Sequence, residues 1–244
     1  MLLRVRSLLF SAYFFIWTVI ILLTIWVFLP FSRAGMLNAL SYWGRGNRFG
    51  LKWIVGLDYE IRGREYIPDH AAIVACKHQS VWETMLFHGL LPNPVFVFKK
   101  ELMAIPLWGA YARKVDTIVI DRSAGTSALK GMVREAAQNF ELGRSLVLFP
   151  EGTRRAPGDP PAYRRGIVAV YAQCGVPVVP VALNSGFFWG PHSLMKLPGT
   201  IVAEFLPPIE PGLDRKTFMK ELETRIETAS NRLFEEAEQA KLLR

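Results

Sequence analysis

The sequence predicts an α/β protein: a single domain with a mixed, largely parallel sheet of about seven strands flanked by helices, preceded by an N-terminal two-helix membrane-associated segment. Short β-branched or aliphatic runs alternate with helical stretches after Val55. The runs at 71–75 and 146–149 are apolar throughout, which is typical of central strands covered on both faces. A stretch without any charged residue, from Ser7 to Ser32, precedes the domain.

The uncharged stretch from Ser7 to Ser32 is long enough for a membrane helix. At ~1.5 Å rise per residue it would extend roughly 39 Å, more than the ~30 Å hydrocarbon core of a bilayer requires. A secretory signal peptide has a shorter apolar core and a small-residue cleavage site, and no convincing site of that kind follows here. We therefore expect the segment to be retained in a bilayer.

The next segment, 33–55, has the pattern of a helix that lies in the headgroup plane of a membrane. Its apolar residues share one face of a helical wheel and its cations share another. These faces comprise Met36, Leu40, Trp43, Leu51 and Ile54, and Arg45, Arg48 and Lys52. A helix docked on the globular domain would give the same pattern, and Gly44, Gly46 and Gly50 disfavour a helix.

The net charge of +8 is concentrated in the N-terminal quarter of the chain. Residues 1–56 contain six basic residues and no acidic one, so we interpret them as a membrane-anchoring segment and 57–244 as the α/β domain. This placement favours membrane phospholipid over nucleic acid as a partner. Cations stand on both sides of the apolar run, so the positive-inside rule does not choose between a span and a hairpin that returns to the cytosolic side.

The pattern after Val55 predicts each element of the domain in order. The expected strands are Leu57–Arg62, Ala71–Cys76, Val95–Phe98, Asp116–Ile120, Ser145–Phe149, Val178–Leu183 and Thr200–Phe205. The expected helices are 80–90, 106–114, 123–142, 164–174 and 215–241. The last has apolar residues at helical spacing and mixed charges outside, so we interpret it as a docked structural helix.

Several common kinds of site lack their motif. The sequence has no G-x-x-x-x-G-K-[ST], G-x-S-x-G, H-E-x-x-H or paired C-x-x-C, which disfavours P-loop, hydrolase, zincin and zinc-ribbon sites. The four histidines are scattered, and Cys76 and Cys174 have no activating group nearby in sequence, so we expect buried thiols in a reduced compartment. We expect no metal and no cofactor.

His78 stands where a predicted strand gives way to a helix, in the run H-Q-S-V-W-E over 78–83. Ligands bind at the carboxyl ends of strands in α/β sheets. A histidine there, with Glu83 five residues on, can act as a general base whose tautomer the carboxylate holds. The structural alternative is a capping box, in which Ser80 caps the helix and Glu83 bonds the Ser80 amide.

A second polar motif, F-P-E-G-T-R over 149–154, also follows a predicted strand. Pro150 ends the strand and Gly152 permits a turn with positive φ. Arg154 and the next residue, also arginine, are suited to bidentate contact with a phosphate. A solvated turn would explain one such motif, but two strand-end motifs on one sheet favour a site.

These motifs resemble the glycerolipid acyltransferase family, most closely its 1-acyl-sn-glycerol-3-phosphate (lysophosphatidic acid) acyltransferases. Four blocks occur in the family order within roughly 57–206. The block at 78–83 is similar to H-x-x-x-x-D with Glu in the acidic place, and 98–109 is similar to K-x-E-L-x-x-x-P-x-x-G. The run at 149–154 matches F-P-E-G-T-R, and 176–183 resembles the apolar proline block.

The resemblance implies that His78 deprotonates the sn-2 hydroxyl of lysophosphatidic acid, which attacks the thioester of acyl-CoA or acyl-carrier protein to give phosphatidic acid. Glu83 would orient His78. The implied acceptor-phosphate residues are Lys99, Glu151, Gly152, Thr153 and Arg154, with Arg122 as a further cation from the end of a neighbouring strand; the implied acyl or donor site comprises Val178, Pro180 and Val181.

Two positions depart from the family pattern. Lys77 stands where Asn often precedes the histidine, and Glu83 replaces Asp. We expect retained function with a shifted His–carboxylate geometry, on a membrane with the catalytic domain on the cytosolic face, which would be the inner membrane in a bacterium. Two alternatives stay open: acylation of another lipid acceptor, and a non-catalytic protein that binds anionic lipid.

Some nearby residues allow more than one interpretation. The run Phe187–Trp189 would line an acyl tunnel or close the core, and we favour the core. Arg164 and Arg165 would reach a phosphate or begin a solvated helix, and we favour the helix. Ser80 resembles a nucleophile beside His78, although a helix N-cap is its commoner role.

Overall fold

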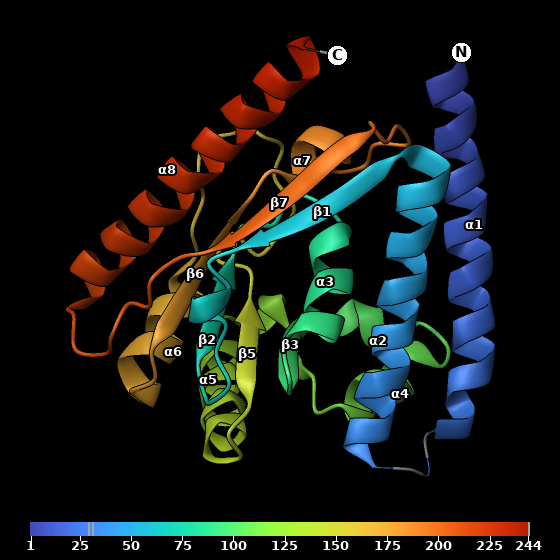
Figure 1. Ribbon diagram of the computed structural model, residues 1–244. Coiled ribbons are helices and arrows are strands. Elements are labelled where there is room, and N and C mark those ends of the chain that lie inside the picture. The colour runs from blue at the N-terminus through green and yellow to red at the C-terminus, as the bar shows by residue number, and fades with distance from the viewer. Residues whose placement is uncertain (29, 31, 244) are drawn as a thin grey trace.

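A central sheet lies between two groups of helices in the computed structural model, which describes residues 1–28, 30 and 32–243 (Figure 1). Leu29 and Phe31, within the apolar run considered above, lie outside the described residues. The helices are α1 (Leu2–Ile25), α2 (Arg33–Gly50), α3 (Trp82–Leu90), α4 (Trp108–Lys114), α5 (Gly125–Glu141), α6 (Arg165–Cys174), α7 (Ser185–Phe188) and α8 (Arg215–Leu242). The strands are β1 (Leu57–Arg62), β2 (Ile73–Cys76), β3 (Pro94–Lys99), β4 (Ile118–Ile120), β5 (Ser145–Leu148), β6 (Val178–Leu183) and β7 (Gly199–Phe205).

The seven strands form one mixed sheet in the order β1-β7-β6-β2-β5-β3-β4, which confirms the predicted fold class. The strands from β6 to β4 in this order are parallel to one another, β7 runs antiparallel to β6, and β1 is parallel to β7. The expected strands are all present, with ends that differ by at most two residues. The short helix α7 and a 3₁₀ turn at Lys100–Ala104 were not expected.

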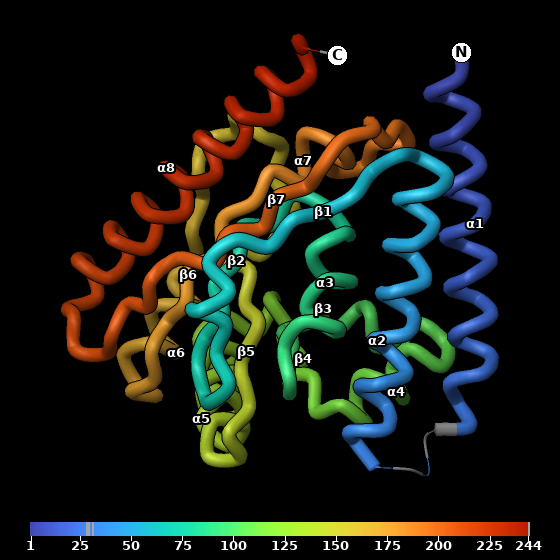
Figure 2. The backbone as a smooth tube through the Cα atoms, in the orientation of Figure 1, coloured from blue at the N-terminus to red at the C-terminus, as the bar shows by residue number. Residues whose placement is uncertain are grey.

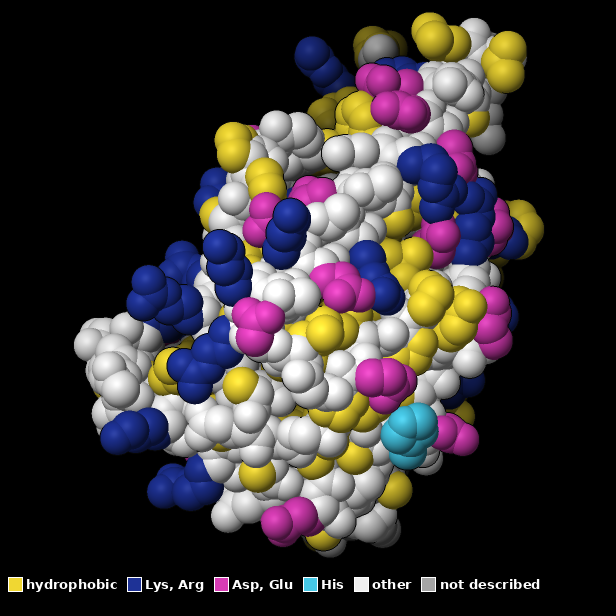
Figure 3. Space-filling model, turned by 90° about the vertical axis from the view of Figure 1, so that its left-hand side faces the viewer, with side chains coloured by type: hydrophobic (Ala, Val, Ile, Leu, Met, Phe, Trp, Pro, Cys, Tyr) yellow, Lys and Arg dark blue, Asp and Glu magenta, His cyan; other side chains and the backbone are white. Residues whose placement is uncertain are grey.

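Both faces of the sheet are covered, which explains the uninterrupted apolar runs. Val74 and Cys76 of β2 pack in a cluster with residues of α1, α2 and α3, whereas Ile73 and Ala75 pack with residues of α5, α6 and α8. Side chains alternate along a strand, so every position of a central strand is buried. The outward face formed by α5, α6 and α8 carries basic and acidic side chains together (Figure 3).

The helices α1 and α2 run side by side in opposite directions against the domain (Figures 1 and 2). A Cβ at Gly46 would lie 2.4 Å from the Trp17 ring, and a Cβ at Gly50 would lie 2.3 Å from the Tyr13 ring. A Cβ at Gly44 would lie 2.5 Å from the carbonyl oxygen of Met85 in α3. The glycines that disfavoured a helix are therefore what lets α2 approach both of its neighbours.

The apolar face of α2 packs against the interior of the protein. The prediction that this face contacts lipid was therefore wrong. Met36, Leu40 and Trp43 are buried, and Leu51 is buried in the π-helical turn that continues α2 to Val55. Two of the predicted lipid-facing cations also have protein partners: Arg48 donates to the carbonyl of Met85 (3.2 Å), and Lys52 pairs with Asp58 (2.6 Å). Amphipathic periodicity is the same for a face against lipid and a face against protein.

The outer surface of α1 is exposed and apolar. Among the described residues, α1 is the one helix long and apolar enough to cross a membrane. Only 11% of its most apolar 18-residue stretch is buried in the protein. It begins before the uncharged run, because Arg6 lies within it and donates to the carbonyl of Ile54 (2.6 Å). Near its other end, the Tyr111 hydroxyl of α4 donates to the carbonyl of Leu22 (2.5 Å). Thus α1 lies along the domain for most of its length.

Candidate active site

The carboxyl ends of the parallel strands meet at one edge of the sheet, and the predicted polar motifs gather there. His78 follows β2, and the turn at 149–155 follows β5. Lys99 ends β3, Arg122 follows β4, and Ser185 follows β6. Because these five strands share one direction, residues distant in sequence reach one edge, as ligand-binding residues do in open α/β sheets.

His78 and Glu83 form a hydrogen-bonded pair, with His78 Nδ1 lying 3.0 Å from Glu83 Oε1. The same oxygen accepts the backbone N–H groups of Gln79 and Ser80, each at 2.6 Å. The other oxygen, Oε2, accepts the hydroxyl of Ser185 at 3.0 Å. Glu83 is completely buried, so these donors replace the water that a carboxylate loses on burial.

The hydrogen bonds assign the tautomer of His78. A carboxylate that only accepts requires a proton on Nδ1, which leaves the lone pair on Nε2. The ring stacks on Phe149 with centroids 4.0 Å apart and planes inclined by 19°, and 17% of the side chain is exposed. The imidazole is therefore held in one orientation, with a basic nitrogen available for a proton.

The two interpretations of Glu83 are compatible, whereas the expected cap of Ser80 is wrong. Glu83 accepts the Ser80 amide as in a capping box and orients His78 at the same time. Helix α3 begins at Trp82 with Val81 at the N-cap, and the buried Ser80 hydroxyl has no partner within the described part of the chain. The acidic half of the capping box is present without its hydroxyl half.

The turn after β5 is hydrogen-bonded directly to the loop that carries His78. The backbone N–H of Arg155 donates to the carbonyl of His78 (2.8 Å). Gly152 has φ +66°, the left-handed conformation that its position in the motif predicted. Glu151 is buried, and burial raises the pKa of its carboxyl. The F-P-E-G-T-R run is thus folded against the His78–Glu83 pair and is not a solvated turn.

Two arginines from outside this turn hold its backbone. Arg122 donates to the carbonyl of Gly152, and Arg164 donates through Nε to the carbonyl of Glu151 (3.1 Å). Burial and the nearby charge of Arg164 lower the pKa of Arg122. The side chains of the half-buried Arg154 and the exposed Lys99 make no hydrogen bond or ion pair with any residue that the structure describes. Two guanidinium groups therefore shape the turn, while Arg154 and Lys99 are available for an anion.

The remaining predicted site residues lie in different surroundings. Thr153 is exposed on the turn. Val178, Pro180 and Val181 are buried within β6, where Val178 packs in the cluster of α5, α6 and α8 and Val181 packs in the opposite cluster. An acyl chain could not reach these side chains without opening the core. Their prediction as an acyl-binding surface is corrected: they build the sheet that carries the site.

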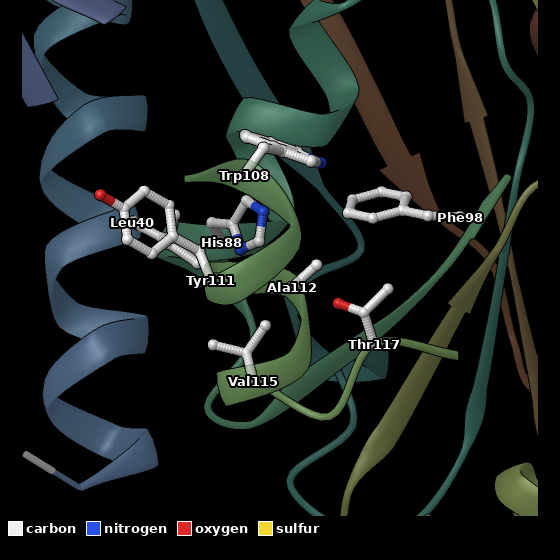
Figure 4. A pocket seen from close by; sticks show the side chains of 8 residues that line it. All are labelled: Leu40, His88, Phe98, Trp108, Tyr111, Ala112, Val115 and Thr117. Atoms are coloured by element: carbon white, nitrogen blue, oxygen red, sulfur yellow. The ribbon is translucent and has the colours of Figure 1, made fainter. Parts of the chain in front are cut away.

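A small apolar cavity lies away from His78, between α2, α3, β3 and α4 (Figure 4). Its volume is about 10 Å³, and His88 is one of its lining residues. Burial lowers the pKa of His88 to about 4 from its ordinary 6.5, so this imidazole is neutral at pH 7. His88 does not belong to the His78–Glu83 pair.

The other expectations for single residues have clear outcomes. Phe188 and Trp189 are buried, and Trp189 packs edge-on against Phe10 of α1, so this run closes the core as favoured. Cys76 is buried as expected, whereas Cys174 is half-buried; burial raises the pKa of both thiols, which agrees with low reactivity.

Sequence reasoning missed three contributors to the site. Arg164 does not begin a merely solvated helix, because its side chain holds the turn at Glu151. Ser185 supports Glu83, and the side chain of Gln79 accepts the N–H of Gly186 (3.1 Å) beside it. Arg164 was considered for a phosphate contact in the sequence, but the solvated helix was favoured. The bond from Ser185 has no local signal.

Comparisons with known proteins identify the family of the chain. The family model described as Acyltransferase matches residues 58–184. A 1-acyl-sn-glycerol-3-phosphate acyltransferase of Pseudomonas aeruginosa is 33% identical over 199 residues, 82% of this chain and 77% of that protein. The protein of the same name from Escherichia coli is 30% identical over 182 residues, 72% and 73% of the two chains.

Among solved structures, the 1-acyl-sn-glycerophosphate (LPA) acyltransferase of Thermotoga maritima shares the fold with a TM-score of 0.79. The match covers 96% of this chain and 98% of that chain at 23% identity. The architecture is therefore shared over nearly the whole length, N-terminal helices included. Given the match to the family model and the identity to the Pseudomonas protein, the chain belongs to the acyltransferase family.

Proposed function

We propose that this chain is a membrane-associated O-acyltransferase that moves a fatty acyl group from acyl-CoA or acyl-carrier protein to the sn-2 hydroxyl of lysophosphatidic acid, giving phosphatidic acid. The observation that carries the proposal is the pair His78 Nδ1–Glu83 Oε1 at 3.0 Å, joined to the 149–155 turn through the His78 carbonyl. The names of the Pseudomonas and Escherichia relatives support the acceptor.

In the proposed mechanism His78 acts as the general base. Its Nε2 takes the proton of the acceptor hydroxyl while the oxygen attacks the thioester carbonyl. Glu83 holds the ring and stabilises the imidazolium that forms. Collapse of the tetrahedral intermediate expels the donor thiolate, which takes the proton from His78. The chain itself would supply no covalent intermediate and would need no cofactor beyond the acyl donor.

The acceptor's phosphate would bind at the 149–155 turn. Arg154 and Lys99 supply charge that no described residue neutralises, and the bonds of Arg122 and Arg164 hold the turn in shape. A guanidinium can contact two phosphate oxygens at once. A phosphate bound there would place the adjacent glycerol backbone next to His78, because the turn and His78 share a backbone hydrogen bond.

Membrane association would come from the exposed apolar surface of α1, extended by aromatic side chains on α2 and its π-helical turn. Phe15, Ile16 and Leu23 are each more than half exposed on α1, as are Tyr42 and Trp53 on the neighbouring segment. Because α1 lies along the domain, a hairpin immersed in one leaflet fits better than an isolated span. The catalytic domain would then lie on the cytosolic face of the membrane.

Turnover of labelled acyl donor with lysophosphatidic acid by the purified protein tests the proposal. Wild-type protein should form phosphatidic acid, and His78→Ala should reduce turnover by roughly 10²–10⁴-fold with unchanged circular dichroism. His70→Ala is the matched control, because His70 is exposed and contacts the neighbouring Asp69. Undiminished activity in His78→Ala would refute the assigned base.

A panel of donors and acceptors in the same assay decides the finer assignments. Acyl-CoA and acyl-carrier protein are compared as acyl donors by the turnover that each supports. Replacing lysophosphatidic acid by the corresponding monoacylglycerol removes only the phosphate, and activity should then fall. Equal activity on both acceptors would favour another lipid acceptor. Vesicle binding without any turnover would favour the non-catalytic alternative.

A further inference from the structure

A second buried ionic cluster lies behind the catalytic pair, and the mechanism above does not use it. Lys77 directly precedes His78 and is only 4% exposed. Its Nζ lies 2.6 and 2.8 Å from the two carboxylate oxygens of Glu227 and 3.4 Å from Oε1 of Glu151. The hydroxyl of Tyr163 donates to Glu227 Oε1 at 2.9 Å.

The cluster joins three parts of the chain at the edge of the sheet. Lys77 follows β2, Glu151 lies in the turn after β5, and Glu227 lies on α8, 150 positions from Lys77. The family-model match ends at residue 184, so α8 lies outside it. Helix α8 was predicted to have a purely structural role, yet its Glu227 carboxylate lies beside the candidate site and pairs with Lys77.

The charges of the cluster depend on one another. A buried ammonium or carboxylate is unfavourable unless it is paired, and here one ammonium lies between two carboxylates. Burial raises the pKa of Glu151, and the charge of Lys77 opposes that rise. The second oxygen of Glu151, Oε2, has no partner in the described part of the chain. Without Lys77, the Glu151 side chain would lose its one side-chain hydrogen-bond donor.

The position of Glu151 is coupled to the rest of the site through the turn that contains it. The same turn carries Arg154, and the N–H of Arg155 bonds to the carbonyl of His78. A shift of Glu151 would therefore move Arg154 relative to His78. Glu83 and the imidazole would stay in place, because their bonds run to Gln79, Ser80 and Ser185 instead.

We propose that Lys77 and Glu227 are positioning residues that hold the 149–155 turn and thereby set how tightly the acceptor's phosphate binds. This inference rests on the proposed function. It gives a role to Lys77, which stands where the family pattern often has Asn before the histidine. It also makes α8 part of the support of the site.

The test compares Lys77→Met and Glu227→Gln with the wild type in the lysophosphatidic acid assay. Each variant should raise the KM for the acceptor about tenfold, the loss expected when a charged contact is misaligned. The KM for the acyl donor should change less than about twofold, because the proposal places only the acceptor's phosphate at the turn. Arg232→Met is the matched control: it removes an ion pair that ties α8 to Glu204 of β7, away from the site.

The outcomes separate positioning from stability. If both KM values stay at the wild-type level, while kcat falls only with the folded fraction measured by circular dichroism, the cluster is merely structural and the inference is wrong. If Lys77→Met does not fold, Glu227→Gln decides alone, because it keeps the side-chain volume and an acceptor for Tyr163. An inactive wild type would instead refute the proposed function, and the inference with it.

Discussion

The hydroxyl of Ser185 donates a hydrogen bond to Oε2 of Glu83 over 3.0 Å, although 102 positions separate the two residues. The other oxygen of Glu83 is already used by His78, Gln79 and Ser80. Within the described part of the chain, Ser185 is therefore the one hydrogen-bond donor to Oε2 of this fully buried carboxylate. The end of β6 thus takes part in orienting the imidazole that follows β2.

Replacing Ser185 by Ala should weaken the His78–Glu83 pair without removing it. Oε2 of Glu83 would lose its donor, and a hydrogen bond to a charged group is worth about 2 kcal/mol. We expect kcat to fall roughly 30-fold with little change in either KM. Ser193→Ala is the control, because that hydroxyl bonds only within its own loop, to Met195. Unchanged kcat in Ser185→Ala would show that Glu83 does not need this support.

Arg154→Met should weaken binding of the acceptor selectively. The guanidinium has no described partner inside the protein, so its removal leaves no buried group unpaired. A lost charge-assisted contact of about 2 kcal/mol corresponds to roughly a 30-fold rise in the KM for lysophosphatidic acid. The KM for the donor serves as the internal reference, and Arg165→Met serves as the control on the neighbouring helix. An equal loss with a phosphate-free acceptor would contradict the assignment of Arg154 to the phosphate.

Gly46→Ala should destabilise the packing of α1 on α2. The new Cβ would meet three atoms of the Trp17 indole at 2.4 to 2.6 Å, so the helices must separate. Overpacking of this kind costs about 1–3 kcal/mol. Gly131→Ala on α5 is the matched control, because its Cβ would meet nothing within 4 Å, and it should stabilise the protein by up to about 1 kcal/mol. Thermal unfolding in detergent measures both, and equal midpoints would contradict the close approach.

His88 should make the free energy of unfolding depend on pH. Its folded pKa of about 4 lies below its ordinary value of 6.5, so between these values the unfolded chain binds a proton that the folded chain does not. Stability is therefore lost as the pH falls from about 6.5 toward 4, by roughly 3 kcal/mol.

The measurement for His88 is chemical unfolding at several pH values for the wild type and for His88→Leu, which has no titrating group. The difference between the two curves should be flat above about pH 7 and should slope below about pH 6.5. His70→Ala controls for histidine in general, because His70 is exposed. A difference curve that stays flat down to pH 4 would contradict the burial of a neutral His88.

The local parts of the site could be predicted from the sequence. His78 and Glu83 are five residues apart at a strand end, so one loop and one helical turn bring them together whatever the rest of the chain does. The F-P-E-G-T-R turn was predictable for the same reason, because Pro150 ends the strand and Gly152 adopts positive φ. The order of strands along the chain and their buried character followed from the apolar runs.

The parts that join distant segments could not be predicted. Ser185 at Glu83 and Glu227 at Lys77 depend on which strands and helices are neighbours, and the chain carries no local pattern for that. The placement of Val178 and Val181 also depends on burial from both sides of the sheet.

The sequence by itself determined the strand-end chemistry and the strongly apolar first helix, because both depend on residue type and short-range spacing. Only the tertiary structure decided where the apolar face of α2 lies, since periodicity does not distinguish lipid from a neighbouring helix. It also decided the meaning of Gly44 and Gly46, which are unfavourable in an isolated helix and necessary where another helix approaches within contact distance. The cost of a residue in its own helix is local, whereas the packing it permits belongs to the whole fold.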